Sequence, residues 1–239
     1  MKPRSRFLIV LLMVFFCGGF ALQVTAGRLT ERAAELKSQL AEKILPYWYA
    51  AQDTRYGGYL LADPGPAKEK SLVTQARMIW TFSLVHRKGY STPQHDYLKA
   101  ARHGHRFLMK HFYDHANGGY FWRTDLAGEP LKEHKFVYGQ AFVIYALVEY
   151  HRASGDNSAL QRAMELYGAL QKHAHDKAHG GWLEHFTRDW KPLPLRDPSA
   201  EAEVAGLKSG NAHLHLMEAF TELYCVTGNG DVRRALEET

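Results

Sequence analysis

Three polar residues stand at helical spacing inside an apolar-rich segment near the C-terminus. Within residues 207–226, Asn211, His215 and Glu218 are separated by four and then three positions, which places them on one stripe of a helix. Burying polar groups is costly unless they are paired or line a cavity, so the stripe predicts a wet pocket. His215 could exchange a proton near neutral pH, with Glu218 fixing its tautomer. The spacing is equally compatible with a buried His–Glu pair that meets no substrate.

Further candidate residues lie in two earlier apolar segments. Arg77 is the only charged residue in 71–85, so it requires either an acidic partner or a polar ligand such as a sugar hydroxyl. Trp80 could be a stacking platform or part of the core. The polar residues Tyr138 and Gln140 of 135–150 could likewise contact a ligand or have a structural role. The candidate catalytic residues are His215 and Glu218, and the candidate substrate-binding residues are Arg77, Trp80, Tyr138, Gln140 and Asn211.

Other kinds of chemistry have little support in the residue pattern. Residues i and i+2 of a helix point roughly 200° apart, whereas helical metal pairs use i, i+3 or i+4. We therefore expect no metal and no cofactor, although three His-x-His pairs occur. No Gly-rich phosphate loop and no cysteine or serine nucleophile motif is present. The three pairs are His103/His105, His173/His175 and His213/His215.

A motif of the form Asp-x-x-x-Gly-Gly-aromatic occurs three times. Its copies begin at Asp53, Asp114 and Asp176, and such a regular period indicates stacked supersecondary units. The glycines allow the positive φ of a tight turn, so we favour a structural role for the motif over direct contact with a ligand. At this period, the residues after the first 26 hold about three and a half units.

Amphipathic and apolar-rich helices are predicted to alternate along the chain. An amphipathic helix keeps one face in water, whereas a helix that is apolar all round is enclosed by other elements. The alternation predicts an outer and an inner ring of helices, which is an all-α toroid of helical hairpins forming one domain over residues 27–239. The amphipathic segments are 30–50, 95–112 and 158–174, and the apolar-rich segments are 71–85, 135–150 and 207–226.

The N-terminus has the pattern of a secretory signal peptide over residues 1–26. Basic residues precede an apolar run over 7–22, and small residues follow near position 26. The run is shorter than the ~20 residues that span a bilayer, so export to the periplasm or medium is expected and an uncleaved anchor is the minority alternative. The formal charge is +5, and three of these charges lie in the signal. The near-balanced remainder gives no reason to expect a nucleic-acid partner, and no membrane contact is expected after cleavage.

Four segments in the expected order resemble the N-acylglucosamine 2-epimerase family, and its bacterial cellobiose 2-epimerase branch in particular. The resemblance implies an (α/α)6 barrel that inverts C2 of a reducing-end sugar or isomerises an aldose to a ketose, without a metal. It implies a mono- or disaccharide substrate, and some members of the family use a nucleotide as an effector. The segments are 76–80, 135–142, 180–192 and 211–219.

The resemblance also implies roles for individual residues. Arg77 would contact the open-chain sugar near O1 and O2, with Tyr138, Asn211 and His215 lining the same pocket. Proton removal beside a carbonyl through a cis-enediolate requires two bases and a cation. The catalytic histidines of the family lie in later repeats, beyond Thr239. The resemblance therefore implies about half a barrel, which we expect to be inactive in epimerisation by itself.

Two other functions remain open at this point. A non-catalytic half-barrel could bind carbohydrate and pair with itself, as a homodimer, or with another subunit. An α/α-toroid glycoside hydrolase or lyase would need two carboxylates across a cleft. Of the acidic residues in the apolar-rich segments, the candidates are Glu149 and Glu218, which gives this last possibility little support.

Overall fold

The computed structural model describes residues 28–60, 67–201 and 204–239. The predicted signal peptide, residues 1–26, lies outside the described residues. The chain divides into two units, Met1–Trp48 and Tyr49–Thr239, and the division falls inside the segment predicted as the first outer helix. None of the helices in the described ranges is both long and apolar enough to cross a bilayer.

The described part of the first unit is helical. Residues 28–39 form a helix, which continues through η1 (Leu40–Ile44) into α2 (Leu45–Tyr49). All residues of 28–39 are exposed, including the apolar Leu36, and Arg32 forms an ion pair of 2.5 Å with Glu35 one turn later. The segment therefore has the helical structure that its amphipathic pattern predicts.

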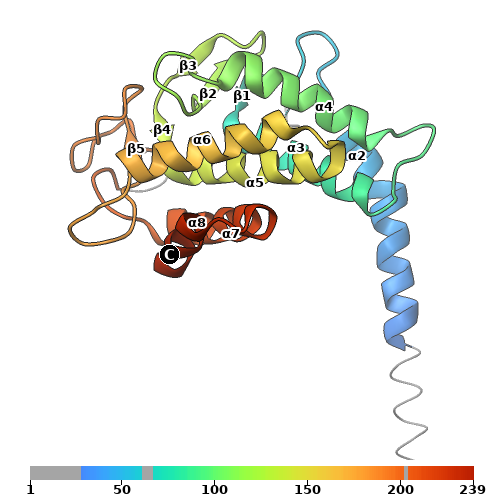
Figure 1. The fold of residues 1–239 in the computed structure, drawn as a ribbon. Coiled ribbons are helices and arrows are strands. Elements are labelled where there is room, and N and C mark those ends of the chain that lie inside the picture. Colours follow the sequence, from blue (N-terminus) through green and yellow to red (C-terminus); the bar gives the residue numbers. More distant parts are fainter. Residues whose placement is uncertain (1–27, 61–66, 202–203) are drawn as a thin grey trace, which may run out of the picture. The chain divides into compact units, whose positions relative to one another are not determined.

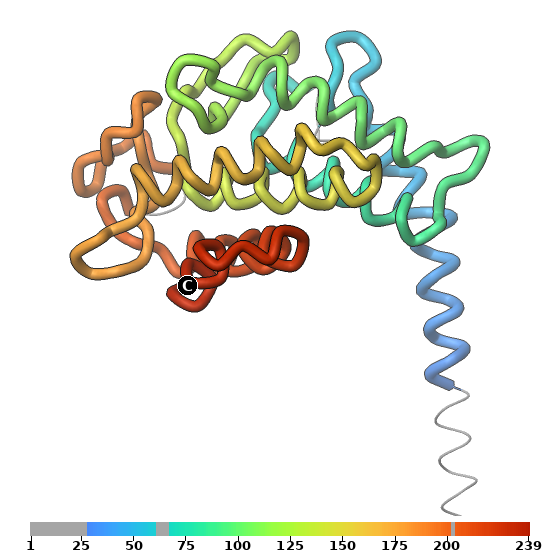
Figure 2. The backbone as a smooth tube through the Cα atoms, viewed as in Figure 1, coloured from blue at the N-terminus to red at the C-terminus, as the bar shows by residue number. Residues whose placement is uncertain are grey.

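The second unit alternates two kinds of helix (Figure 1). The apolar-rich helix α5 lies between α3 and α7, and α3, α5 and α7 each pack against the amphipathic helix that follows. Figure 2 shows this path from green α4 through yellow α5 and α6 to red α7 and α8. The inner helices are α3 (Leu72–Arg87), α5 (Val137–Ser154) and α7 (Gly210–Thr227), and the outer ones are α4 (Tyr97–Phe107) with η2 (Leu108–Phe112), α6 (Asn157–His173) and α8 (Gly230–Glu238).

The inner helices differ in how far they are enclosed. Helix α5 has an inner helix on each side and is buried along most of its length, as its apolar sequence predicts. Helix α7 packs against α5 and α8, but its Leu214 and Met217 side chains are 51% and 44% exposed. One face of α7 is thus open in the described part of the chain, although the sequence pattern is that of an enclosed helix.

Short strands link the turns to the starts of the inner helices. β1 (Glu69–Ser71), β2 (Arg123–Asp125) and β3 (Pro130–Lys132) form an antiparallel sheet in that order. β4 (Lys135–Phe136) pairs antiparallel with β5 (His185–Phe186). Because β1 and β4 run directly into α3 and α5, these pairings fix where the two helices begin.

A lysine two residues before each inner helix closes the Gly-Gly turn that precedes it. In each pair the lysine Nζ donates to the Oδ2 of the aspartate that opens the motif, and the same carboxylate accepts backbone N–H groups of its own turn. The first two lysine side chains are fully buried and the third is 30% exposed. The pairs are Lys70–Asp53 at 2.7 Å, Lys135–Asp114 at 2.9 Å and Lys208–Asp176 at 2.8 Å.

The electrostatics of the middle pair are dominated by hydrogen bonds. Burial alone would raise the pKa of the Asp114 carboxyl. Hydrogen bonds from Lys135, Arg188 and Asn117 outweigh burial and hold that pKa below its ordinary value of 3.8. Asp114 is therefore a carboxylate at neutral pH, and it neutralises the buried ammonium group beside it.

The fourth residue of each inner helix holds the same turn by its backbone. The Gln75 amide donates to the Tyr59 carbonyl at 2.9 Å and accepts from the Tyr59 N–H at 2.8 Å, and Gln140 makes the same two bonds with Tyr120 at 2.8 and 2.9 Å. In the third turn, His213 Nε2 accepts from the backbone N–H of residue 182 at 3.2 Å. The motif is thus a structural turn, in agreement with the favoured role.

Glycine is required where the turn meets the helix. Gly58 has φ +70°, and a Cβ atom there would lie 2.5 Å from Gln75 Oε1. In the third turn, a Cβ at Gly181 would lie 2.7 Å from His213 Nε2. Both contacts are too short for any side chain, and the positive φ adds strain. The second glycine of the motif therefore allows the helix side chain to reach the turn backbone.

Candidate functional site

The three inner helices present equivalent positions to one groove. Each helix begins two residues after its lysine, so the second, sixth and ninth helix residues correspond across the repeats. These positions lie on one stripe of each helix. They are Val73, Arg77 and Trp80 in α3, Tyr138, Phe142 and Tyr145 in α5, and Asn211, His215 and Glu218 in α7.

The sixth positions form a continuous row across the helices. The Arg77 guanidinium carbon lies 4.6 Å from the centroid of the Phe142 ring, and the Phe142 and His215 ring centroids are 4.4 Å apart. Tyr138 approaches the same imidazole, with ring centroids 6.1 Å apart. The structure therefore brings three predicted site residues together around a phenylalanine that the sequence analysis did not select.

His215 and Glu218 are paired as the helical spacing predicts. His215 Nδ1 lies 2.9 Å from Glu218 Oε2, and the two side chains are 15% and 48% exposed. If the carboxylate accepts the Nδ1 proton, Nε2 carries a free lone pair and can take a proton from a bound molecule. The pair is partly open to solvent, so it does not match the alternative of a fully buried structural pair.

Arg77 presents an unneutralised cation. Its side chain is exposed, and no carboxylate of the described ranges forms an ion pair with it. The Phe142 ring supports its guanidinium group. Of the two possibilities left by the sequence, the structure favours an arginine available to a polar ligand over a structural ion pair.

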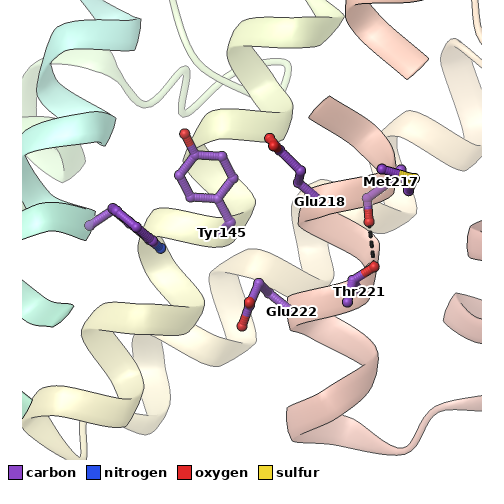
Figure 3. Close-up of a pocket in the computed structure, with 6 residues that line it drawn as sticks. Tyr145, Met217, Glu218, Thr221 and Glu222 are labelled. Atoms are coloured by element: carbon purple, nitrogen blue, oxygen red, sulfur yellow. Dashed lines mark hydrogen bonds between the residues drawn. The ribbon is translucent and has the colours of Figure 1, made fainter. Parts of the chain in front are cut away.

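The ninth positions line a pocket of about 440 Å³ (Figure 3). The Trp80 and Tyr145 rings meet edge to face, with centroids 6.0 Å apart, and Glu218 lies on the opposite wall. Burial raises the pKa of the Tyr145 hydroxyl, and interaction with Arg77 opposes this effect. The pocket therefore combines the aromatic rings of Trp80 and Tyr145 with the carboxylates of Glu218 and Glu222, which can accept hydrogen bonds. Its lining residues are Trp80, Tyr145, Met217, Glu218, Thr221 and Glu222.

A buried carboxylate links the first turns of α5 and α7. Glu184 is fully buried; it accepts from the Tyr138 N–H at 3.2 Å and from the Ser209 hydroxyl at 3.1 Å. Ser209 is in turn the N-cap of α7. This linkage fixes the register of Tyr138 and of half-buried Asn211, the second residues of their helices. Sequence reasoning missed Glu184 because its role depends on contacts with two distant helix ends.

Gln140 is placed differently from the other predicted substrate-binding residues. Its side chain is fully buried, and its amide oxygen and nitrogen bond to the Tyr120 backbone. Gln140 therefore holds the Gly-Gly turn that precedes α5, and we do not include it among the residues of the groove.

The described ranges, 28–60, 67–201 and 204–239, contain no group of three or more His, Cys, Asp and Glu side chains arranged to hold a metal ion.

Solved structures share this arrangement of helices. A family 76 glycoside hydrolase (mannosidase) from Bacteroides thetaiotaomicron matches with a TM-score of 0.60 over 80% of this chain and 48% of its own, at 18% identity. At 18% identity the similarity is evidence for the fold alone. That fold is the (α/α)6 toroid, and this chain matches about half of its length. The cellobiose 2-epimerase from Spirochaeta thermophila matches with a TM-score of 0.79 and 39% identity, over 89% of this chain and 53% of its own.

The chain belongs to the N-acylglucosamine 2-epimerase (GlcNAc 2-epimerase) family, whose model matches residues 56–238. A cellobiose 2-epimerase of Bacteroides fragilis is 34% identical over 208 residues, which are 84% of this chain and 52% of the relative. A D-mannose isomerase of Marinomonas mediterranea is 28% identical over 79% of this chain and 45% of its own. The chain thus spans about half the length of the curated relatives it matches. The predicted family and fold class are confirmed.

Proposed function

We propose that the groove of α3, α5 and α7 binds the reducing-end sugar of a mono- or disaccharide and supplies part of the site of a 2-epimerase or aldose–ketose isomerase. The observation that carries this proposal is the row in which an unneutralised Arg77 and a His215–Glu218 pair lie on either side of Phe142. Cellobiose is a suitable first substrate to test, because cellobiose 2-epimerases are among the relatives.

The residues of the groove suit an enediolate reaction. Proton removal from C2 of an open-chain sugar places negative charge on O1, and Arg77 would stabilise this oxyanion. His215 Nε2 would accept or return a proton, while Glu218 holds the ring and stabilises the imidazolium. Tyr138 and Asn211 would position the sugar hydroxyls, and Trp80 would pack against its C–H groups.

Inversion at C2 needs a base on each face of the enediolate, and the described groove offers one histidine–carboxylate pair. We therefore expect the chain to bind cellobiose but not to epimerise it at C2. Calorimetry with cellobiose, and proton NMR for the C2 epimer of the reducing-end sugar, would check both statements. Saturable binding without epimer formation is the expected result. Absence of binding would contradict the proposed function, and epimer formation clearly above background would contradict the one-base account.

The exposed face of α7 favours a second candidate, a carbohydrate-binding protein that pairs with a second copy of itself. Leu214 and Met217 are about half exposed, and such side chains on neighbouring turns suit an interface between helices. Light scattering after size-exclusion chromatography would show a dimer that Met217→Glu disrupts. A monomer at all accessible concentrations would contradict self-association and leave the epimerase proposal unchanged.

A further inference from the structure

Phe142 lies at the centre of the groove but is not open to a ligand. Its side chain is 2% exposed, so a bound sugar would not reach its ring. The ring nevertheless contacts four residues of the site. The Arg77 guanidinium lies 4.6 Å from its centroid, and its centroid distances to the rings of His215, Tyr145 and Tyr138 are 4.4, 5.0 and 6.1 Å.

An unneutralised arginine at the surface of a groove would ordinarily sample many rotamers. The face of an aromatic ring attracts a guanidinium group, and the attraction is stronger when the pair is desolvated. Arg77 has this support from Phe142, a contact with the Tyr145 hydroxyl, and no ion pair within the described ranges. The ring therefore restricts where the guanidinium group can lie.

The same ring determines where the imidazole lies. The planes of the Phe142 and His215 rings are inclined by 45°, and the Glu218 carboxylate fixes the other side of the imidazole through Nδ1. The imidazole is thus held between an aromatic ring of α5 and a carboxylate of its own helix. Movement or loss of the Phe142 ring would loosen both the cation and the base.

We propose that Phe142 is a positioning residue, which sets the separation between the Arg77 cation and the His215–Glu218 base without touching the sugar. This inference rests on the proposed function for its chemical meaning. Its structural part, the restriction of Arg77 by the Phe142 ring, holds in the free protein and can be measured without any sugar.

The test compares two buried phenylalanines that differ in what they touch. Phe142→Leu removes the ring from the groove, whereas Phe220→Leu is the matched control. Phe220 is fully buried in α7 and contacts Tyr167 and Trp182. Both substitutions remove the same atoms from a core, so both should lower Tm. A third variant, Phe142→Tyr, keeps the ring.

Two readouts separate positioning from general stability. The first is ¹⁵N relaxation of the Arg77 Nε–H group, assigned with Arg77→Lys, in the free protein; the second is the Kd for cellobiose. We expect Phe142→Leu to make the Arg77 side chain mobile and to weaken binding about fivefold to twentyfold, from the loss of a cation–π contact. Phe220→Leu should leave both readouts within twofold of wild type, and Phe142→Tyr should restore the restricted Arg77 signal.

The outcomes distinguish this inference from the proposed function. An Arg77 side chain as restricted in Phe142→Leu as in wild type, or equally mobile in Phe220→Leu, would overturn the positioning role. If the wild-type chain binds no cellobiose, the proposed function fails, whereas the relaxation measurement still decides whether Phe142 restrains Arg77.

Discussion

At the scale of single residues, the groove is chemically diverse because three equivalent helix positions hold different side chains. The sixth residue is Arg77 in α3, Phe142 in α5 and His215 in α7. A cation, an apolar support and a base thereby stand side by side on neighbouring helices. The shared backbone register sets their spacing, and the differing side chains supply the chemistry.

Arg77→Lys should weaken binding of a reducing sugar. Lysine keeps the charge, but it lacks the planar group that lies on Phe142 and presents several donors to vicinal oxygens. We expect a loss of affinity of about tenfold, which corresponds to about 1.4 kcal/mol, with little change in Tm. Arg106→Lys, on the exposed side of α4, is the control. Equal cellobiose affinities for the two variants in calorimetry would contradict this role of Arg77.

At the scale of elements, the Gly-Gly turns and their lysines set the position of each inner helix. The lysine reaches the turn carboxylate, and the fourth helix residue bonds to the turn backbone. These contacts join a turn to a helix that begins many residues later. They therefore fix both where the helix starts and which face it turns to the groove.

Gly58→Ala should destabilise the protein. Alanine there requires an unfavourable positive φ, and its Cβ would lie 2.5 Å from Gln75 Oε1, so we expect the free energy of unfolding to fall by more than about 1 kcal/mol. Gly168→Ala is the control, because Gly168 is inside α6, has nothing within 4 Å of a built Cβ, and should gain about 0.5–1 kcal/mol. If denaturant unfolding showed that both substitutions change the free energy of unfolding in the same direction, this explanation of the turn would be contradicted.

Lys135→Met should be far more damaging than Lys208→Met. Removal of Lys135 leaves the fully buried Asp114 carboxylate with the half-exposed Arg188 as its remaining cationic partner, so we expect a loss of about 3 kcal/mol of unfolding free energy, the lower end for a broken buried pair. The more exposed Lys208–Asp176 pair should contribute much less, because solvent screens its charges. Similar losses for both variants in denaturant unfolding would contradict the difference between these pairs.

The middle pair also predicts the direction of a pH effect. The folded-state pKa of Asp114 is lowered, so its contribution is present above the ordinary carboxyl pKa of 3.8 and is lost as pH falls through the lower folded value. Wild-type stability should therefore fall with pH below about 4. Lys135→Met should show a shallower fall, measured by unfolding at pH 7 and at acid pH. An equal acid dependence in both proteins would argue against this coupling.

At the scale of the whole molecule, much of the fold is predictable from the sequence. The alternation of amphipathic and apolar-rich segments identifies the helices of the second unit within a few residues. It does so because the extent to which a helix is buried determines which of its positions are apolar. The stripe of Asn211, His215 and Glu218 follows from spacing alone, and the structure confirms the His215–Glu218 contact.

Other parts of the site could not be predicted from polarity and spacing in one helix. Gln140 is a polar residue in an apolar helix, but its amide is satisfied by a turn twenty residues earlier. Phe142 and Tyr145 resemble core aromatics, and only the rotation of α5 brings them to the groove. One signal was available in the sequence, because a lysine is followed five positions later by Gln75, Gln140 or His213. That register would have aligned the three helices.

The most direct test of the central claim is an amide NMR titration of the chain with cellobiose. We expect saturable shift changes in the first three turns of α3, α5 and α7, around Arg77, Tyr138 and His215, with much smaller changes on α4 and α6. Changes confined to the outer helices, or no saturable change at millimolar sugar, would contradict the assignment of this groove as a sugar site.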